Sequence, residues 1–113
     1  KNKKTMKDTF PKSSVMVIGE MIGYADGGVV SKQVLKSEAG NITLFSFDRD
    51  QGLSEHTAPF DALVQILDGE AEIMLGGETI RLKKGESVIM PAGVKHSLHA
   101  IIRFKMLLTM IRG

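Results

Sequence analysis

The chain has 113 residues and a formal net charge of +2, with 42% hydrophobic and 25% charged residues. This length fits one domain, and the composition excludes a disordered chain and a membrane-embedded one. The sequence has no cysteine, which excludes disulfides and thiolate metal sites. Because no apolar run follows the basic start, we expect a cytoplasmic protein.

The positive charge is concentrated at the N-terminus. Five of the 15 Lys and Arg residues fall within residues 1–12 with one acidic residue among them, so residues 13–113 carry a net charge of −2. We interpret residues 1–12 as a basic flexible tail and residues 13–113 as the single domain. A nucleic-acid-binding protein needs a basic face with stacking aromatic residues, which this domain lacks. We therefore expect neither a nucleic acid nor a membrane as a partner.

The first part of the domain gives a mixed signal. Residues 15–24 fit neither the helical nor the strand period, so a turn of helix and an edge strand both remain open. The glycines at 27 and 28 predict a turn, because glycine tolerates positive φ. Strands are then expected over residues 29–36 and 41–47.

The remainder of the chain alternates short apolar segments with turn residues, a pattern typical of an all-β sandwich or barrel. Breaks are predicted at residues 68–69, 84–85 and 91–93. A tight hairpin turn is predicted at residues 76–77, where two glycines can both adopt positive φ. Strands are expected over residues 62–67, 71–75, 79–82, 87–90, 96–102 and 104–111.

The segment expected to form the last strand is apolar almost throughout, with Lys105 and Thr109 as its only polar interior positions. A strand covered on one face would alternate more clearly, so we expect a second sheet or a second subunit to cover its other face. On this basis we expect a homodimer, the commonest symmetric assembly.

Two histidines lie at the ends of the two segments that most clearly suggest a functional site. His56 opens the stretch 56–69, and His96 closes the stretch 85–96. If the fold pairs these segments, both imidazoles lie in one interior. His99 is an odd number of residues from His96, so it should point away from that interior.

The residues that end in His96 resemble the second motif of the cupin superfamily, whose members include RmlC-like barrels. That motif runs from a glycine through Pro-x-Gly to a histidine and then an asparagine. Gly85, Pro91, Gly93 and His96 match it in spacing, and Ala100 stands at the asparagine position.

The residues that begin near His56 resemble the first cupin motif less closely. His56 matches its first histidine and Gly69 its closing glycine, although Gly52 gives a shorter opening spacer than the family pattern. Ala58 and Ala62 occupy the positions of the second histidine and the glutamate.

The resemblance covers roughly residues 40–111 and implies a double-stranded β-helix, or jelly-roll barrel, with its site at the open end. The chain is also similar to small one-domain bacterial cupins, many of which have no assigned activity. Cupins typically hold a metal with three histidines and one carboxylate, of which His56 and His96 remain here. Asp61, the carboxylate nearest in sequence, has the wrong strand parity. We therefore expect a degenerate metal site and no cofactor, while a divalent transition metal on His56 and His96 stays open.

Our first functional hypothesis is a small-molecule-binding cupin of unassigned activity. The alternative is a metal-dependent cupin enzyme, an oxygenase or isomerase, that uses His56 and His96, and a purely structural role is a third possibility. The sequence does not decide whether the protein is an enzyme. The expected ligand-binding residues are His56, Ala58, Ala62, Val64 and His96, with Phe45 or Phe47 and Met106 as further candidates.

Overall fold

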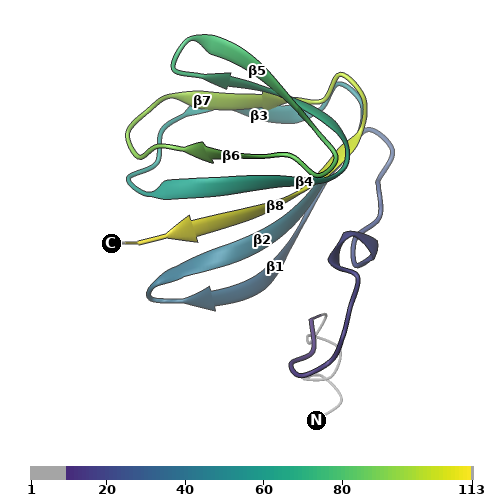
Figure 1. Cartoon of the computed structure of the whole chain (residues 1–113). Coiled ribbons are helices and arrows are strands. Elements are labelled where there is room, and N and C mark those ends of the chain that lie inside the picture. The colour runs from purple at the N-terminus through teal and green to yellow at the C-terminus, as the bar shows by residue number, and fades with distance from the viewer. Residues whose placement is uncertain (1–9, 113) are drawn as a thin grey trace.

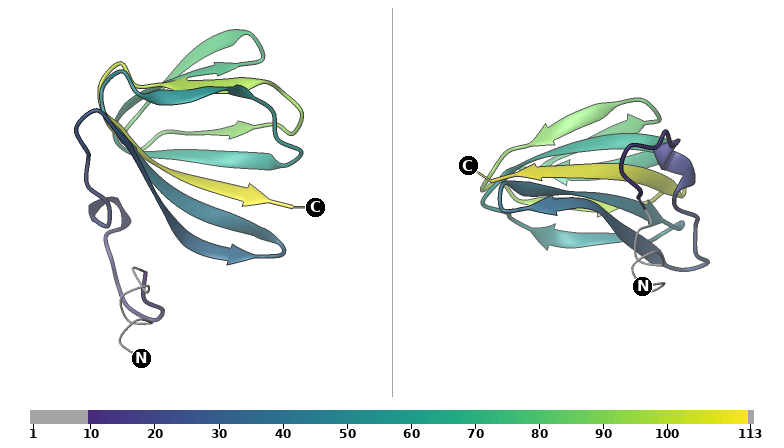
Figure 2. Two further views of the ribbon diagram at one scale, coloured as in Figure 1. Left: turned by 180° about the vertical axis from the view of Figure 1, so that it is seen from behind. Right: turned by 90° about the horizontal axis from the view of Figure 1, so that it is seen from below.

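The computed structural model describes residues 10–112, so most of the predicted basic tail over residues 1–12 lies outside the described residues. Within that range, eight antiparallel strands and one short 3-10 helix form a curled barrel (Figures 1 and 2). No helix among the described residues 10–112 is long and apolar enough to cross a membrane. The elements are η1 (Ile18–Glu20), β1 (Val29–Ser37), β2 (Gly40–Phe47), β3 (Gly52–His56), β4 (Asp61–Leu75), β5 (Glu78–Lys83), β6 (Ser87–Met90), β7 (His96–His99) and β8 (Phe104–Ile111).

The strands form two sheets that enclose one core. The first sheet has the order β1-β2-β8-β4-β6, and the second has the order β3-β7-β4-β5. Strand β4 belongs to both sheets. This is the jelly-roll arrangement, so the predicted all-β double-stranded β-helix is confirmed.

The core forms because most of the strands have one apolar face. In β4, Ala62, Val64 and Ile66 are buried, whereas Asp61 is exposed, in line with the predicted strand parity. Phe47 of β2 stacks on a phenylalanine of β8 with ring centroids 4.6 Å apart. The same hydrophobic cluster includes Ile73, Leu82 and Leu98 of the second sheet, so the two sheets share one core.

Strand β4 continues through residues 68–69, where the sequence predicted a break. Its pairing with β8 shifts register between Ile66 and Asp68, which is the mark of a β-bulge. Gly69 then has a φ of 73°, and a Cβ there would lie 2.0 Å from the carbonyl oxygen of Arg103. The glycine therefore bends the strand from the first sheet into the second without ending it.

Two further expectations need correction. Strand β3 was not predicted, because its five residues are mostly polar and four of them are exposed. Strand β7 ends at His99 instead of continuing to residue 102, since residues 100–103 form the connection to β8, in which Ala100 is buried and the other three residues are exposed. In residues 15–24, which were left open, the short 3-10 helix η1 forms and no strand does.

The two ends of the barrel differ. The connections β1–β2, β3–β4, β4–β5 and β6–β7 lie at one end, on the left of Figure 1, beside the end of β8. We call it the histidine end, because His56 and His96 lie there. The other connections and η1 lie at the opposite end.

Residues 17–24, which we call the N-terminal strap, cross the outer face of the first sheet near the opposite end. Ser46 donates a hydrogen bond to the carbonyl of Gly23 at 2.8 Å, and Lys105 donates one to the carbonyl of Gly19 at 2.7 Å. Leu44, which also faces outward on this sheet, is fully buried. Part of the second face of β8 is therefore covered by the protein's own N-terminal strap, where the sequence suggested another sheet or subunit.

Tyr24 anchors the end of the strap. Its hydroxyl donates a hydrogen bond to Oδ2 of Asp68 at 2.5 Å, and the guanidinium of Arg103 lies 4.3 Å from its ring centroid. Burial raises the pKa of Tyr24 above its ordinary value, and the hydrogen bond to Asp68 raises it further, while Arg103 acts in the opposite sense. The neutral phenol thus fastens the strap to the bend of β4.

Replacing Gly69 should test the importance of the bend. Gly69→Ala should lower the free energy of unfolding by about 3 kcal/mol or more, because the methyl group collides with a backbone carbonyl at positive φ. Gly77→Ala is the matched control, since Gly77 also has positive φ but faces open space. The control should lose only about 1–2 kcal/mol in urea unfolding. Equal losses would contradict a special role for Gly69.

Titration of Tyr24 should show the strength of the anchor. It is the only tyrosine, and the sequence has no tryptophan, so the ultraviolet absorbance of tyrosinate reports on it alone. Because the pKa is raised in the folded state, the native protein should form tyrosinate only well above the ordinary pKa of about 10. The folded state then binds more protons than the unfolded state above about pH 10, so stability should fall as pH rises there. Tyr24→Phe should lose this part of the pH dependence, and an ordinary titration of native Tyr24 would refute the anchor.

Candidate functional site

The structure brings His56 and His96 together on neighbouring strands. They are Cα partners in the pairing of β3 with β7. Their Nε2 atoms lie 3.0 Å apart, and their rings meet edge to face at 68°. His96 is 5% exposed, whereas His56 is exposed. The expected convergence of the two imidazoles is therefore observed, but only His96 is in the interior.

The other ring nitrogens contact backbone carbonyls. Nδ1 of His56 lies 2.8 Å from the oxygen of Ser54, and Nδ1 of His96 lies 3.2 Å from the oxygen of Val94. Carbonyls only accept hydrogen bonds, so both contacts require a proton on Nδ1. Two neutral imidazoles have two N–H protons for three contacts, which leaves two lone pairs facing each other between the Nε2 atoms. One additional proton on either ring, an external hydrogen-bond donor or a metal cation would each satisfy them.

The other predicted ligand-binding residues are apolar. Ala62 and Val64 are buried on the inner face of β4, and Ala58 is partly buried in the β3–β4 connection. Ala62 pairs in register with Met90 on one side and Met110 on the other. Among the further candidates, Phe47 and Met106 belong to the core cluster, and Phe45 packs against it.

Asp61 is committed to a structural contact. Its Oδ1 accepts a hydrogen bond from the backbone N–H of Ala92 at 2.8 Å. This contact ties the start of β4 to the β6–β7 turn that carries the Pro-x-Gly segment. Asp61 is thereby held on the outside of the sheet, as strand parity predicted, and cannot complete a metal site with the histidines.

The donor set does not fit a catalytic metal centre. A separation of 3.0 Å is what two adjacent ligands about 2.1 Å from one ion would show at about 90°. Such centres need about three protein ligands, however, and residues 10–112 contain no group of three or more His, Cys, Asp or Glu residues placed to hold a metal. Two histidines alone would give a weak site.

Asn41 is a candidate that sequence reasoning missed. It alternates with Phe45 and Phe47 along β2, so it lies on the core face, and its Cα partner in β8 is Met110. Its Oδ1 is buried and has no hydrogen-bond partner among the described residues. An unpaired buried acceptor costs about 1–3 kcal/mol, so it marks a position where a donor would bind. A two-residue alternation count from the phenylalanines could have placed it there.

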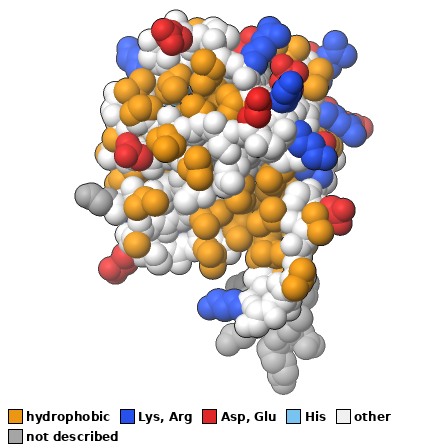
Figure 3. Space-filling model, in the orientation of Figure 1, with side chains coloured by type: hydrophobic (Ala, Val, Ile, Leu, Met, Phe, Trp, Pro, Cys, Tyr) orange, Lys and Arg blue, Asp and Glu red, His pale blue; other side chains and the backbone are white. Residues whose placement is uncertain are grey.

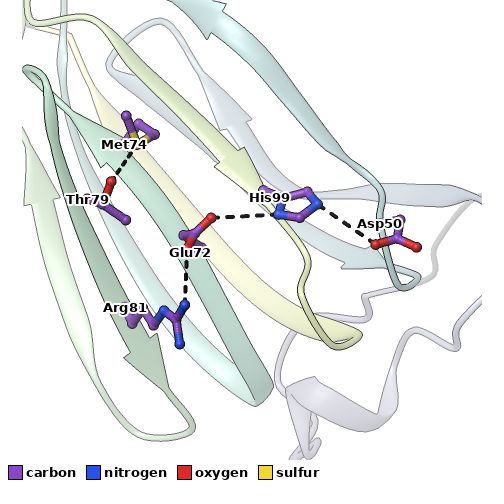
Figure 4. Close-up of polar contacts among 6 residues, drawn as sticks. All are labelled: Asp50, Glu72, Met74, Thr79, Arg81 and His99. Carbon is purple, nitrogen blue, oxygen red and sulfur yellow. Dashed lines mark hydrogen bonds and ion pairs between the residues drawn. The ribbon is translucent and has the colours of Figure 1, made fainter.

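His99 lies outside the barrel, as expected. Its side chain is half-exposed, with Nδ1 3.7 Å from Glu72 and Nε2 4.0 Å from Asp50 (Figure 4). Arg81 also pairs with Glu72 at 3.4 Å, and Thr79 contacts Met74 beside it. Exposed ion pairs of this kind contribute little to stability. The two ring nitrogens of His99 also face opposite carboxylates, so the cluster is no metal chelate.

The structure is a jelly-roll barrel with the paired histidines His56 and His96 at one end. A family model described as "Cupin domain" matches residues 44–110, and the chain belongs to the cupin family. This confirms the family that the Pro-x-Gly-containing motif suggested.

Several known proteins are similar to the chain over most of its length. An uncharacterized protein from Aquifex aeolicus is 29% identical over 89 residues, which span 77% of this chain and 74% of that protein. A conserved protein of unknown function from Streptococcus pyogenes has a solved structure with a TM-score of 0.88 and 32% identity, covering 93% of this chain and 92% of that one. A cupin superfamily protein from Desulfitobacterium hafniense has a TM-score of 0.87 and 28% identity, covering 93% and 96% of the two chains. These relatives support the family and carry no assigned activity.

Proposed function

We propose that the protein binds a small organic molecule at the histidine end of the barrel. The observation that carries this proposal is the His56–His96 pair, whose Nε2 atoms lie 3.0 Å apart while both Nδ1 atoms contact backbone carbonyls. In its neutral form the pair presents acceptor lone pairs at the histidine end of an apolar interior. Ligand pockets commonly combine apolar walls with a few convergent polar groups.

The polar groups also suggest the chemical class of the ligand. The Nε2 atoms and Oδ1 of Asn41 are acceptors, and both lie at the histidine end. The side chains of Ala58, Ala62 and Val64 are apolar, and those of Ala62 and Val64 are buried on the inner face of β4. A ligand with hydroxyl or amino donors on an apolar body matches this arrangement. The lack of cysteine is consistent with work in a reducing compartment, and we place it in the cytoplasm.

The rival function is a metal-dependent oxygenase or isomerase. The separation of 3.0 Å between the Nε2 atoms favours it, because adjacent ligands of one ion show this spacing. The alanines at positions 58 and 62 and the structural commitment of Asp61 count against it. We therefore rank binding of an organic molecule first.

A thermal-shift screen tests the proposal. Wild-type protein should be stabilised by some hydroxylated or aminated compounds, by about 2.7 kcal/mol at a concentration of 100 times Kd. His56→Ala should lose this shift, and Asn41→Leu should weaken it. His99→Ala is the matched control and should keep it, because His99 lies outside the barrel. If no compound shifts the wild type, or if His56→Ala responds equally, the proposal is wrong.

Metal analysis distinguishes binding of an organic molecule from the rival function, a metal-dependent enzyme. Protein purified without chelators should contain no stoichiometric transition metal on our account. Stoichiometric metal that is absent from His56→Ala but retained in His99→Ala would favour the enzyme and overturn our ranking.

A further inference from the structure

The β6–β7 turn leads directly into His96, and its backbone is bonded to both neighbouring connections at the histidine end. The N–H of Gly93 donates a hydrogen bond to the carbonyl of Ala58 in the β3–β4 connection at 2.8 Å. On the other side, the N–H of Gly76 in the β4–β5 turn donates one to the carbonyl of Lys95 at 2.9 Å. The β6–β7 turn is therefore held between these two connections.

Asp61 adds a side-chain contact to the same turn. Its Oδ1 accepts a hydrogen bond from the N–H of Ala92 at 2.8 Å, and among residues 10–112 no other side chain accepts one from an N–H of this turn. None of the ion pairs within those residues includes Asp61. In Figure 3 most of the Lys and Arg side chains gather on the right, away from the histidine end on the left. In the described part of the chain, this carboxylate thus acts through a peptide N–H and not through an ion pair.

One carbonyl of the turn orients the ring of His96. Nδ1 of His96 lies 3.2 Å from the oxygen of Val94, and its Nε2 lies 3.0 Å from Nε2 of His56. The hydrogen bond made by one ring nitrogen decides which nitrogen carries the proton, so a carbonyl beside Nδ1 keeps the proton there. The N–H of Val94 also bonds to the carbonyl of Pro91 at 3.3 Å, which closes the turn around Ala92. The position of the Val94 carbonyl therefore depends on what holds the turn.

We propose that Asp61 is a positioning residue for the histidine pair. By holding the β6–β7 turn, it keeps the Val94 carbonyl against Nδ1 of His96 and so fixes the neutral tautomer whose Nε2 is an acceptor. Hydrogen-bond partners behind a metal-bound histidine fix its tautomer and ring orientation in the same way. The purpose of this role rests on the proposed function, because the Nε2 acceptor is the group offered to the ligand.

The tautomer of His96 can be measured from the chemical shifts of its ring nitrogens by NMR, without a ligand. The chain has three histidines, so His56→Ala and His99→Ala assign the three rings. At about pH 9, where an imidazole is ordinarily neutral, His96 of the wild type should carry its proton mainly on Nδ1. Asp61→Ala should raise the ratio of the Nε2–H to the Nδ1–H tautomer by about tenfold, because the turn loses a hydrogen bond to a charged group. Asp61→Asn should keep the ratio close to that of the wild type, because an amide oxygen still accepts the bond.

A matched control and a second measurement separate the steps. Glu38→Ala removes the same charge from the exposed β1–β2 connection, also at the histidine end, and should leave the ratio for His96 unchanged. Amide hydrogen exchange follows the turn itself. The N–H of Ala92 should exchange about tenfold faster in Asp61→Ala than in the wild type. The N–H of Gly93 should also exchange faster, because both belong to one turn.

Three results would overturn the proposal: a wild-type His96 with its proton mainly on Nε2, an unchanged ratio in Asp61→Ala, or an equal shift in Asp61→Asn. The last would mean that the charge, and not the hydrogen bond, is responsible. The wild-type measurement needs no variant to fold, and none of the measurements needs a bound molecule. If the thermal-shift screen finds no ligand while the tautomer depends on Asp61 as expected, the proposed function fails and the positioning role stands.

Discussion

The bend of β4 is the constraint on which the rest of the structure depends. One strand serves both sheets because Gly69 adopts a φ of 73° with the carbonyl of Arg103 where a side chain would be. Both ends of β4 therefore return to the same end of the barrel. Ala62 then lies beside Met110, and Leu75 lies beside His96. The N-terminal strap strengthens the bend from outside through the contact between Tyr24 and Asp68.

The arrangement of the histidine pair follows from this geometry and from the backbone. Strand pairing aligns His56 with His96, and two carbonyls orient the rings so that their Nε2 atoms face each other. Alanines stand where the cupin motif has a second histidine and a glutamate, so these two positions offer no ligating side chain. The same fold that could hold a metal thus offers acceptor groups beside a hydrophobic interior, and this chemistry suits an organic ligand with donor groups.

Much of the fold could be predicted, since burial imposes strand parity. Ala62 and Val64 face inward, β6 and β8 have the predicted bounds, and the motif around His96 identified the family. The features that were missed depend on contacts distant in sequence. Gly69 looks like a turn residue until β8 is seen to pair across the bulge. Strand β3 is too polar to be recognised without β7 beside it.

The candidate site was predicted only in part, because some of its features also depend on contacts between residues distant in sequence. Spacing alone indicated that His56 and His96 converge, but the exposure of His56 depends on its position at the mouth of the barrel. Asn41 was missed because its importance lies in an absent hydrogen bond, which only the packing around its side chain reveals. The N-terminal strap was also unpredictable, because its polar contacts lie on the first sheet and its own residues follow no period.

The most direct test is a crystal structure of protein purified without added metal or ligand, with attention to the two Nε2 atoms. Our account predicts density for an organic molecule whose donor atom lies about 2.8 Å from these nitrogens. A single-atom peak about 2.1 Å from both nitrogens, completed by further ligands, would contradict it in favour of a metal centre. Imidazole rings turned away from each other would contradict it altogether.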